Sequence, residues 1–435
     1  MQQTSSPISS RRRFLKNAAI TLGTFTIVPR YVLGKGFIAP SDQINLGLIG
    51  AGRKSKNLAS SFIKTGAVRI LAVSDVFEEK MRTFQEQVTQ LYAQHQEIEN
   101  YNSVQAYFEF EDLLSRSDID GVIVASPDHW HAAMSIAAMK AGKDVYCEKP
   151  LSRTIKEGRA MVEAARKYQR IFQTGSQQRS NRNFRHACEL VRNGYLGEIK
   201  KVLVNVGDPS VPYNLSAEPI PNGLNWDRWC GPAPKLNYHS DLAPVNNNIN
   251  YWPKWRMYTE YGGGILADWG AHMFDIAQWA LGMDHTAPIE WIPPSDPNAK
   301  RGLRMIYANG VEMVHEDFNR SWAVRFIGTK GSLDVSRQFL DSQPESIVSA
   351  TIKEGEQRLY HSDNHYQNWL DSIKSRKTPI CDVEIGHRSC SVCKIADIAY
   401  ALRRPLKWDP EKEAFIGNKA ANKMRGGKWR RSYRY

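Results

Sequence analysis

Between residues 44 and 170, short apolar segments alternate with longer segments of helical periodicity. Residues 44–49 (INLGLI), 68–74 (VRILAVS) and 121–126 (GVIVAS) have the length and the β-branched content of buried strands. Each is followed by a turn and by a longer segment whose apolar residues recur at helical spacing. A strand that returns to the same sheet through a helix lies parallel to the strand before it, so this alternation predicts a doubly wound, parallel α/β sheet.

The second half of the chain has a different pattern. Residues 199–206 (IKKVLVNV) predict a long strand, and Asn-Gly and Lys-Gly turns at 309–310 and 330–331 predict hairpins. Residues 207–260 are rich in Pro, Asn and Trp and show no periodicity. An irregular stretch of that length is usually functional or wraps a partner surface. The pattern and the chain length together predict two domains.

A G-A-G motif at residues 50–52 stands between the first strand and the first helix. Gly50 permits a tight turn, and Gly52 lets a pyrophosphate approach the backbone at the helix N-terminus. Asp75, at the end of the second strand, is placed to bind ribose hydroxyls and to repel a 2′-phosphate. These residues predict NAD as the cofactor and make NADP the less favoured choice, although Arg53 offers a positive charge to a phosphate.

Two further loops follow parallel strands, where ligands bind in this architecture. The first, S-P-D-H-W-H at 126–131, contains an H-x-H pair, His129 and His131. No third metal ligand stands nearby, so we predict no metal site and expect cofactor or packing contacts instead. The second loop is E-K-P at 148–150. The motif alone leaves open whether Lys149 orients a substrate hydroxyl or is a surface lysine.

The segment GGGILADWGAHMFD, residues 262–275, combines three glycines with carboxylates and an imidazole. If a helix begins near Ile265, Asp268 and His272 lie four residues apart on one face. A carboxylate and an imidazole so placed form a proton-transfer pair in which His272 is the base. The alternative is a capped core helix with a satisfied histidine, and the glycines and the Asp-His pair favour the functional interpretation.

The N-terminus predicts export. Residues 10–16, SRRRFLK, match the twin-arginine signal pattern at every position, and the apolar run at 17–28 is too short to span a membrane. We expect residues 1–40 to be a twin-arginine signal and linker, and the protein to be periplasmic or otherwise exported. No clean A-x-A cleavage site is present, so an uncleaved anchor remains an alternative. No later segment is apolar enough to span a membrane, so we expect no stable membrane insertion after signal removal.

The net charge of +13 is concentrated at the two ends of the chain. Residues 1–40 and 423–435 each carry six basic residues and no acidic one, which leaves about +1 for the rest. A near-neutral body has no broad phosphate-binding face, so we expect no nucleic-acid partner. The basic end, RGGKWRRSYRY, could contact an acidic partner, but such a tail is more often solvated or docked on its own protein.

Taken together, the G-x-G motif, Asp75, the E-K-P element and the GGG-x₃-D-x-G-x-H-x₂-D pattern resemble the Gfo/Idh/MocA oxidoreductase family, over roughly residues 43–410. The resemblance implies a Rossmann domain (41–170) and a C-terminal α/β domain with a large open, mostly antiparallel sheet (171–410), followed by a basic tail (411–435). It also implies that Lys149, Asp268 and His272 act together on a substrate hydroxyl, and that the 126–131 loop and E-K-P flank the nicotinamide. The residues expected to bind the cofactor are Gly50, Gly52, Arg53, Asp75, Ser126, Pro127, His131 and Glu148.

The function expected from these features is NAD-dependent hydride transfer at a carbinol of a sugar or cyclic polyol. One alternative is a redox-neutral, NAD-dependent glycosidase or lyase like those of glycoside hydrolase family 109. Another is a non-catalytic binding protein on an oxidoreductase scaffold. Members of the family are often dimers or tetramers, so a homo-oligomer is expected. Because the periplasm is not expected to supply free NAD, we expect the chain to be exported with the cofactor already bound.

Overall fold

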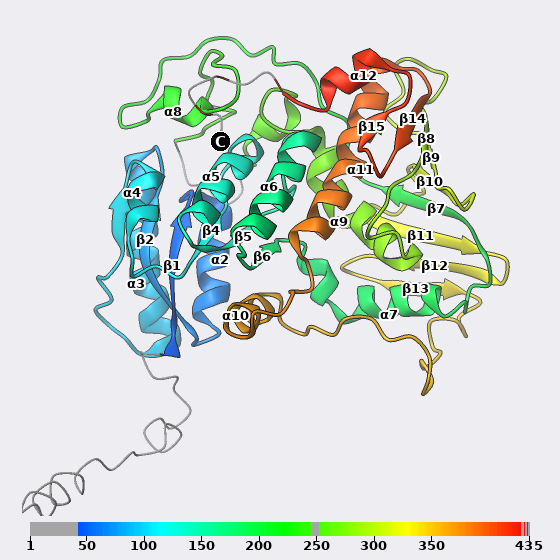
Figure 1. Cartoon of the computed structure of the whole chain (residues 1–435), viewed down its shortest axis with the longest axis horizontal. Helices are drawn as coiled ribbons and strands as arrows, with labels where there is room; N and C mark the ends of the chain where they lie inside the picture. The colour runs from blue at the N-terminus through cyan, green and yellow to red at the C-terminus, as the bar shows by residue number, and fades with distance from the viewer. Residues whose placement is uncertain (1–41, 246–251, 428–429, 431–432, 434–435) are drawn as a thin grey trace, which may run out of the picture. The chain divides into compact units, whose positions relative to one another are not determined.

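The computed structural model describes residues 42–245, 252–427, 430 and 433 (Figure 1). The predicted export signal at 1–40 lies outside these residues. Backbone contacts divide the chain into Met1–Gln43 and Ile44–Tyr435, and every helix and strand given below belongs to the second unit.

The first sheet is six-stranded and parallel, as the sequence predicts. Its strand order is β3-β2-β1-β4-β5-β6. The chain turns from one half of the sheet to the other between β1 and β4, and ligands bind beyond the carboxyl ends of strands at such a point. The strands are β1 (Ile44–Ile49), β2 (Val68–Ser74), β3 (Gln105–Tyr107), β4 (Gly121–Val124), β5 (Asp144–Cys147) and β6 (Phe172–Thr174).

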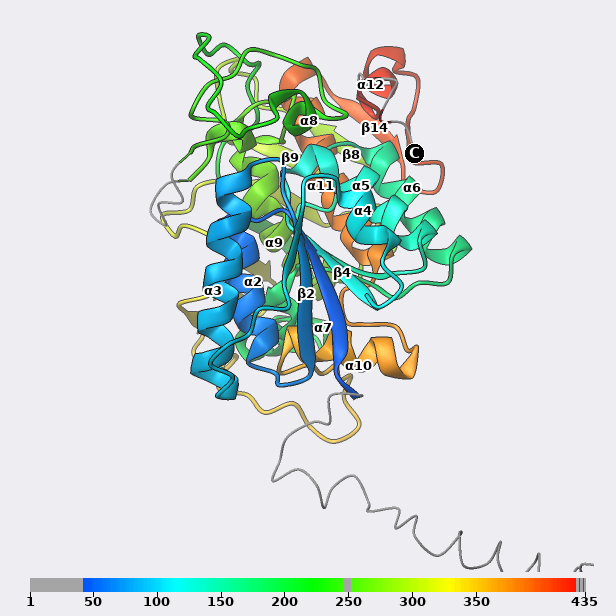
Figure 2. The same cartoon turned by 90° about the vertical axis from the view of Figure 1, so that its left-hand side faces the viewer.

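Helices connect these strands and cover the sheet (Figure 2). Helix α6 begins at a capping box, in which Thr154 and Glu157 satisfy backbone N–H groups at its first turn. The helices of this region are α2 (Arg53–Ile63), α3 (Glu78–Gln96), α4 (Phe110–Ser115), α5 (Asp128–Lys140) and α6 (Ile155–Lys167). Helix α10 (His365–Ser375), from much later in the chain, packs against α2.

The second sheet is nine-stranded, with the order β13-β12-β11-β7-β10-β9-β8-β14-β15. Its neighbours are antiparallel except for β7 and β10, which run parallel. The expected mostly antiparallel sheet is therefore confirmed. The strands are β7 (Ile199–Asn205), β8 (Glu290–Ile292), β9 (Leu303–Ile306), β10 (Glu312–His315), β11 (Ala323–Gly328), β12 (Gly331–Val335), β13 (Leu340–Gln343), β14 (Leu406–Asp409) and β15 (Ala414–Phe415).

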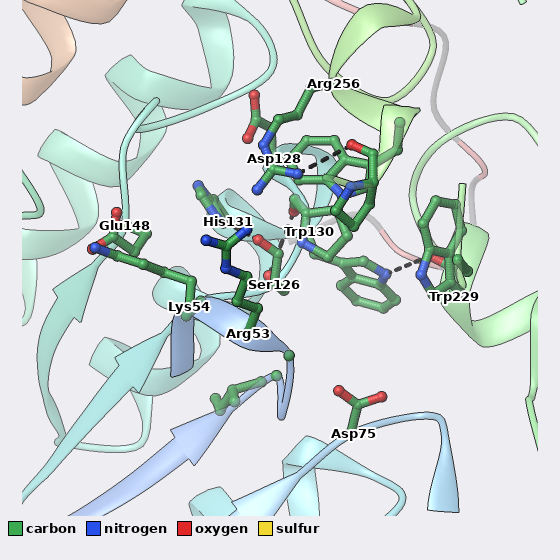
Figure 3. A pocket seen from close by; sticks show the side chains of 18 of the residues that line it. Arg53, Lys54, Asp75, Ser126, Asp128, Trp130, His131, Glu148, Trp229 and Arg256 are labelled. Atoms are coloured by element: carbon green, nitrogen blue, oxygen red, sulfur yellow. Dashed lines mark hydrogen bonds and ion pairs between the residues drawn. The ribbon is translucent and has the colours of Figure 1, made fainter. Parts of the chain in front are cut away.

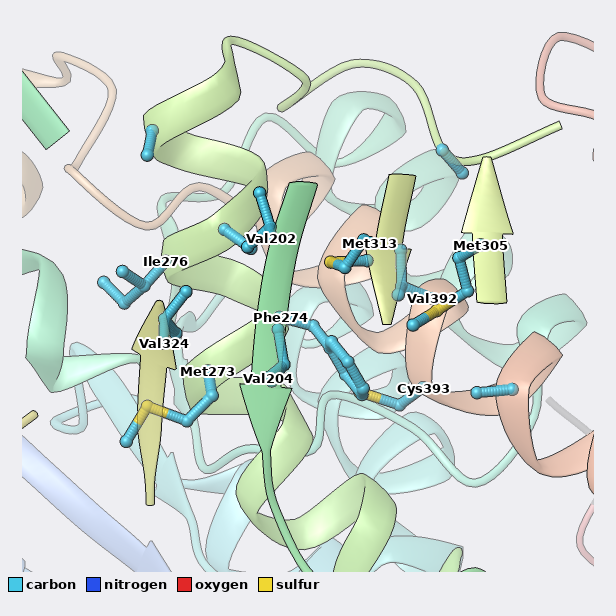
Figure 4. Packing of buried hydrophobic residues seen from close by; sticks show 14 of the residues in the cluster. Val202, Val204, Met273, Phe274, Ile276, Met305, Met313, Val324, Val392 and Cys393 are labelled. Carbon is cyan, nitrogen blue, oxygen red and sulfur yellow. The ribbon is translucent and has the colours of Figure 1, made fainter. Parts of the chain in front are cut away.

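Three helices, α7 (Arg182–Arg192), α9 (Gly264–Leu281) and α11 (Val383–Leu402), pack on this sheet around one apolar core (Figure 4). Helix α11 also packs against α6, so it joins the core of the second sheet to the parallel domain. The short helix α12 (Lys419–Met424) follows β15. Because α9 carries the segment with the predicted proton-transfer pair, this core holds that pair in place relative to the parallel sheet.

Candidate active site

One cavity lies beyond the carboxyl ends of the parallel strands, where the loops after β1, β2, β4 and β5 meet helix α9 (Figure 3). Every residue that the sequence analysis names as catalytic or cofactor-binding lines this cavity. The residues come from loops that follow different strands and from a helix more than a hundred residues further along the chain. Their assembly in one cavity is therefore a product of the fold.

The glycine motif after β1 has the geometry that a bound pyrophosphate needs. Gly50 has a φ of +94°, and a Cβ there would lie 2.9 Å from the carbonyl oxygen of Ala125. A Cβ on Gly52 would meet no protein atom within 4 Å. Ser55 stands where the dinucleotide-binding motif G-x-G-x-x-G has its third glycine. It is buried and donates a hydrogen bond from its hydroxyl to the Gly50 carbonyl. The turn formed by residues 50–52, called the glycine cradle below, therefore closes without a third glycine. Its open side faces the cavity.

Asp75 closes the far end of the cavity (Figure 3). Its Oδ2 accepts a 2.7 Å hydrogen bond from the backbone N–H of Ala51, and its Oδ1 accepts one of 3.0 Å from Phe77. Burial raises the pKa of Asp75, while Lys80, also on the cavity wall, opposes that rise. Two backbone N–H groups thus fix this carboxylate beside the glycine motif, in the position where such a group binds ribose hydroxyls.

His131 joins the two loops that were expected to flank the nicotinamide. Its Nδ1 lies 2.8 Å from the carbonyl oxygen of Pro150, and its Nε2 lies 2.9 Å from that of Ser126. Both ring nitrogens therefore donate, as in a protonated imidazole. Burial opposes this state, but interactions with Cys147 and Asp128 and the Pro150 carbonyl outweigh it and raise the pKa of His131 to about 10. The imidazole cross-links the loops.

His129, the other histidine of the H-x-H pair, makes a packing contact. It is buried, and its Nε2 donates a 2.9 Å hydrogen bond to the carbonyl oxygen of Trp229. Burial lowers its pKa to about 3. Among the described residues no group of three or more His, Cys, Asp or Glu side chains is arranged to hold a metal ion.

The depressed pKa of His129 gives a prediction about acid stability. An unfolded histidine titrates near 6.5, so below that pH the unfolded chain binds a proton that the native chain refuses, and stability is lost as pH falls from 6.5 toward 3. His129→Gln keeps the donor to Trp229 without the titration. Denaturant melts at pH 7 and pH 5 should show that the wild type loses about 2 kcal/mol more than the variant. Equal losses would contradict a buried neutral imidazole.

Lys149 and Asp268 form a buried ion pair on the cavity wall. The Lys149 ammonium donates to Oδ1 of Asp268 at 2.9 Å and to its backbone carbonyl at 2.8 Å. The Arg256 Nε lies 3.5 Å from the same Oδ1. Although burial opposes ionisation, these two cations hold the pKa of Asp268 below its usual value. The second oxygen, Oδ2, is buried without a hydrogen-bond partner among the described residues, so its capacity to accept a hydrogen bond is unused there.

His272 lies one turn further along α9 and is also buried. Burial, Lys149 and Arg337 lower the pKa of its imidazole well below 6.5, so the ring is neutral at neutral pH. Its Nε2 lies 3.2 Å from Nη2 of Arg337. A guanidinium has no acceptor, so Nε2 must carry the lone pair and Nδ1 the proton. The ring is thus in the form that a general base requires.

Glu148, the first residue of the E-K-P element, anchors the loop that carries Lys149. Its Oε1 accepts a 2.8 Å hydrogen bond from Gln177 and lies 3.2 Å from the ammonium of Lys54. Its carboxylate lies against Gly175, where a Cβ would lie 2.8 Å from the same Oε1. Glu148 therefore positions the loop and contributes negative charge to the cavity wall.

Sequence reasoning missed four cavity residues with clear contacts: Lys54, Gln177, Arg256 and Arg337. Lys54 alone had a signal, since it follows the glycine motif directly. Arg256 lies in the irregular 207–260 segment, where its guanidinium stands 4.2 Å from the rings of both Trp252 and Trp255.

The 207–260 segment forms part of the cavity wall. It contains α8 (Trp226–Cys230) and ends at a 3₁₀ turn, η5 (Lys254–Met257), and Trp226 stacks on Trp229 with ring centroids 4.7 Å apart. Trp229, Trp252, Trp255 and Arg256 all line the cavity. This part of the segment is therefore packed, as a functional loop would be.

The basic end of the chain docks on its own protein at the two positions described. The Arg430 guanidinium makes hydrogen bonds of 2.8 and 2.9 Å to the carboxylate of Asp227 in α8. The Tyr433 ring contacts Trp130 edge-on, with centroids 5.4 Å apart. Trp130 lines the cavity, so Tyr433 lies behind its wall.

The last aspartate of the α9 motif, Asp275, has a structural role. It is fully buried and pairs with Nε and Nη2 of the equally buried Arg179, at 2.8 Å each. Arg179 also binds Asp284 at 2.7 Å. His387, to which the sequence assigned no role, lies 2.6 Å from Glu413 and is absent from the cavity wall.

Comparison with known families places these features in context. Residues 44–176 match the model "Oxidoreductase family, NAD-binding Rossmann fold", and residues 201–435 match "Oxidoreductase family, C-terminal alpha/beta domain", both of the Gfo/Idh/MocA group. The second match alone covers more than half of the chain. The chain belongs to the Gfo/Idh/MocA oxidoreductase family. It is therefore an oxidoreductase with an NAD-binding Rossmann domain, and the observed glycine cradle and Asp75 fit that cofactor.

Three relatives indicate how far the similarity of this Gfo/Idh/MocA chain extends. A myo-inositol 2-dehydrogenase of Thermotoga maritima is 24% identical over 370 residues, which cover 79% of this chain and 89% of that protein. A glycosyl hydrolase family 109 protein of a Shewanella species is 31% identical over 209 residues, 43% of this chain and 44% of that protein. The crystal structure of an aldose-aldose oxidoreductase from Caulobacter crescentus superposes with a TM-score of 0.57 at 19% identity, covering 84% of this chain and 99% of that one.

No helix within the described ranges is long and apolar enough to cross a membrane.

Proposed function

We propose that this chain transfers hydride between a carbinol of a sugar or cyclic polyol and an NAD molecule held tightly in the cavity. The observation that carries the proposal is the Lys149–Asp268 ion pair, which shares one cavity with a neutral His272 and the glycine cradle. When bound, NAD supplies the hydride acceptor. The remaining tasks, which are to bind the hydroxyl, orient it and remove its proton, fall to side chains of this protein.

Each of the three side chains has a separate task in this proposal. His272 accepts the hydroxyl proton, because burial and neighbouring cations keep its imidazole neutral. The Lys149 ammonium donates a hydrogen bond to the reacting oxygen and polarises it. Asp268 holds Lys149 through Oδ1 and offers its unpaired Oδ2 to a substrate hydroxyl. The cavity therefore binds a carbinol with a neighbouring hydroxyl better than an isolated alcohol.

The relatives support a carbohydrate substrate. The Thermotoga protein is named for an inositol and the Caulobacter protein for aldoses. The cavity wall also carries Trp229, Trp252 and Trp255, and aromatic faces suit the apolar faces of sugar rings.

Export and assembly complete the proposal. The twin-arginine pattern at 10–16 supports transport of a folded, cofactor-loaded protein. A cofactor that does not exchange must be restored within each cycle, which favours coupled oxidation and reduction of two sugars over release of NADH. We also propose a homodimer or homotetramer.

A second candidate function rests on the family 109 relative, which is 31% identical over less than half of each chain. This second hypothesis, glycosidase activity, predicts release of the aglycone from chromogenic glycosides without added cofactor. Our proposal predicts no such release, but conversion of one sugar to its ketone or lactone while a second sugar is reduced, measured by chromatography of the products. Aglycone release without any net sugar oxidation would favour the glycosidase.

A further inference from the structure

Most cations on the cavity wall already face a carboxylate. Lys54 lies 3.2 Å from Glu148, and Lys149 and Arg256 lie on either side of Asp268. Two lining arginines, Arg53 and Arg337, have no carboxylate within ion-pair distance among the described residues. Arg53 opens helix α2 beside the glycine cradle, where the charge of the NAD pyrophosphate is met. Arg337 carries a charge that no carboxylate of the described residues contacts directly, although Glu148 and Asp268 attract it from further away.

Arg337 lies in the turn between β12 and β13, on the side of the cavity that holds the proposed catalytic groups. Its guanidinium stands 4.8 Å from the ring of Trp269, which in turn stacks on Trp322 with centroids 4.5 Å apart. A planar cation held against an aromatic face keeps its N–H edge free for a ligand. The stack therefore presents a preformed donor edge to the cavity.

The same guanidinium blocks the proposed base. Nη2 of Arg337 donates to Nε2 of His272 across 3.2 Å, and that nitrogen holds the lone pair of the ring. A substrate hydroxyl cannot donate to an occupied lone pair. A ligand that draws the guanidinium away would free Nε2, and a negatively charged group does this best, because hydrogen bonds to charged acceptors are about twice as strong as those to neutral ones.

We propose that the substrate of this site carries a single negative charge, as in a sugar carboxylate or a sugar sulfate ester, and that this charge binds Arg337. The inference rests on the proposed function and specifies the substrate class. One unpaired guanidinium matches a monoanion, whereas a phosphate monoester carries about two charges at neutral pH. Binding of the anion draws Arg337 away from His272. The charged substrate thereby frees the base that accepts its hydroxyl proton.

The distance between Arg337 and His272 also bears on where the anion binds relative to the reacting hydroxyl. Arg337 contacts His272 at 3.2 Å before the anion binds, so a guanidinium that turns to the anion keeps it in the neighbourhood of the ring that takes the hydroxyl proton. We therefore choose ligands in which the charge and the carbinols belong to one sugar unit. A uronate, an aldonate or a singly sulfated monosaccharide meets this condition.

The test measures binding to the full-length, NAD-loaded protein by calorimetry. The ligands are glucuronate, gluconate and glucose 6-sulfate, each compared with a neutral partner: the methyl ester of glucuronate, glucitol and glucose. We expect at least one acid to bind about 10- to 100-fold more tightly than its partner, and added salt to weaken it. Arg337→Gln should remove that preference, with the loss of affinity falling on the acids and not on the neutral sugars. Tighter binding of the carboxylates than of the sulfate would identify the anion as a carboxylate, and the reverse result would identify it as a sulfate ester.

Arg404→Gln is the matched control, because Arg404 is exposed and makes a single hydrogen bond, to Asn418, outside the cavity. It should keep the preference for acids. Equal affinity for acids and neutral partners, or an equal loss for both in Arg337→Gln, overturns the proposal. Tight, Arg337-dependent binding of an acid without any reduction of NAD would support the anion site and contradict the proposed hydride transfer, so the two failures are distinct.

Discussion

Replacing Lys149 by Ala should abolish turnover while leaving NAD bound. The Lys149 ammonium is the donor closest to Asp268 and, in our account, polarises the reacting oxygen, so its loss should lower kcat by about 10³-fold, within the range for a positioned proton-transfer group. Affinity for NAD should change little, because the glycine cradle and Asp75 lie on the other part of the cavity. Steady-state assays with the preferred sugar, and titration of the unloaded protein with NAD, measure the two effects.

Two further variants separate chemistry from packing. Lys149→Met keeps most of the side-chain volume beside Asp268 and should be as inactive as Lys149→Ala. Lys200→Ala removes an exposed lysine that pairs with exposed Glu198, and should retain full activity. Full activity in Lys149→Ala, or a parallel loss of NAD binding, would contradict the role assigned to this lysine.

Gly52→Val should weaken NAD binding at least about 100-fold without destabilising the unloaded protein. A Cβ at Gly52 meets no protein atom within 4 Å, so the fold accommodates the side chain. The same side chain would fill the space through which a pyrophosphate reaches the backbone N–H groups at the start of α2. Fluorescence titration with NADH and thermal melting of the nucleotide-free protein check the two halves of this prediction.

Gly50→Ala is the informative contrast. Gly50 has a φ of +94° and stands against the Ala125 carbonyl, so a side chain here should destabilise the protein by about 2 kcal/mol or more. The smaller change Gly52→Ala should lie between the wild type and Gly52→Val in NAD affinity. A Gly52→Val protein that binds NAD normally would mean that the cofactor does not lie against this cradle.

Much of the site could be predicted because parallel strands align their ends. Residues that directly follow β1, β2, β4 and β5 must meet at one edge of the sheet, so the glycine motif, Asp75 and Lys149 are brought together by the fold class itself. Helical spacing likewise put Asp268 and His272 on one face of α9. These predictions needed only local pattern and the topology of the sheet.

The charged residues that complete the cavity could not be predicted from the sequence. Arg256 and Arg337 come from an irregular segment and from a turn between strands of the second sheet, and neither has a periodic signal. Their position depends on how α9 and that sheet pack against the parallel domain, which is a tertiary property. The same packing explains why Asp275, in the same motif as Asp268, faces buried Arg179 and not the cavity.

The most direct test of the account is to identify what the cavity holds. The full chain, expressed in the cytoplasm and purified without added nucleotide, is denatured, and the released small molecules are identified by mass spectrometry. The account predicts about one NAD per chain, and a rise in absorbance at 340 nm when the preferred sugar is added to the intact protein. A protein that is empty and also fails to bind NAD on titration would contradict the central claim that the cradle, Asp75 and the lysine–aspartate pair form one NAD-dependent active site.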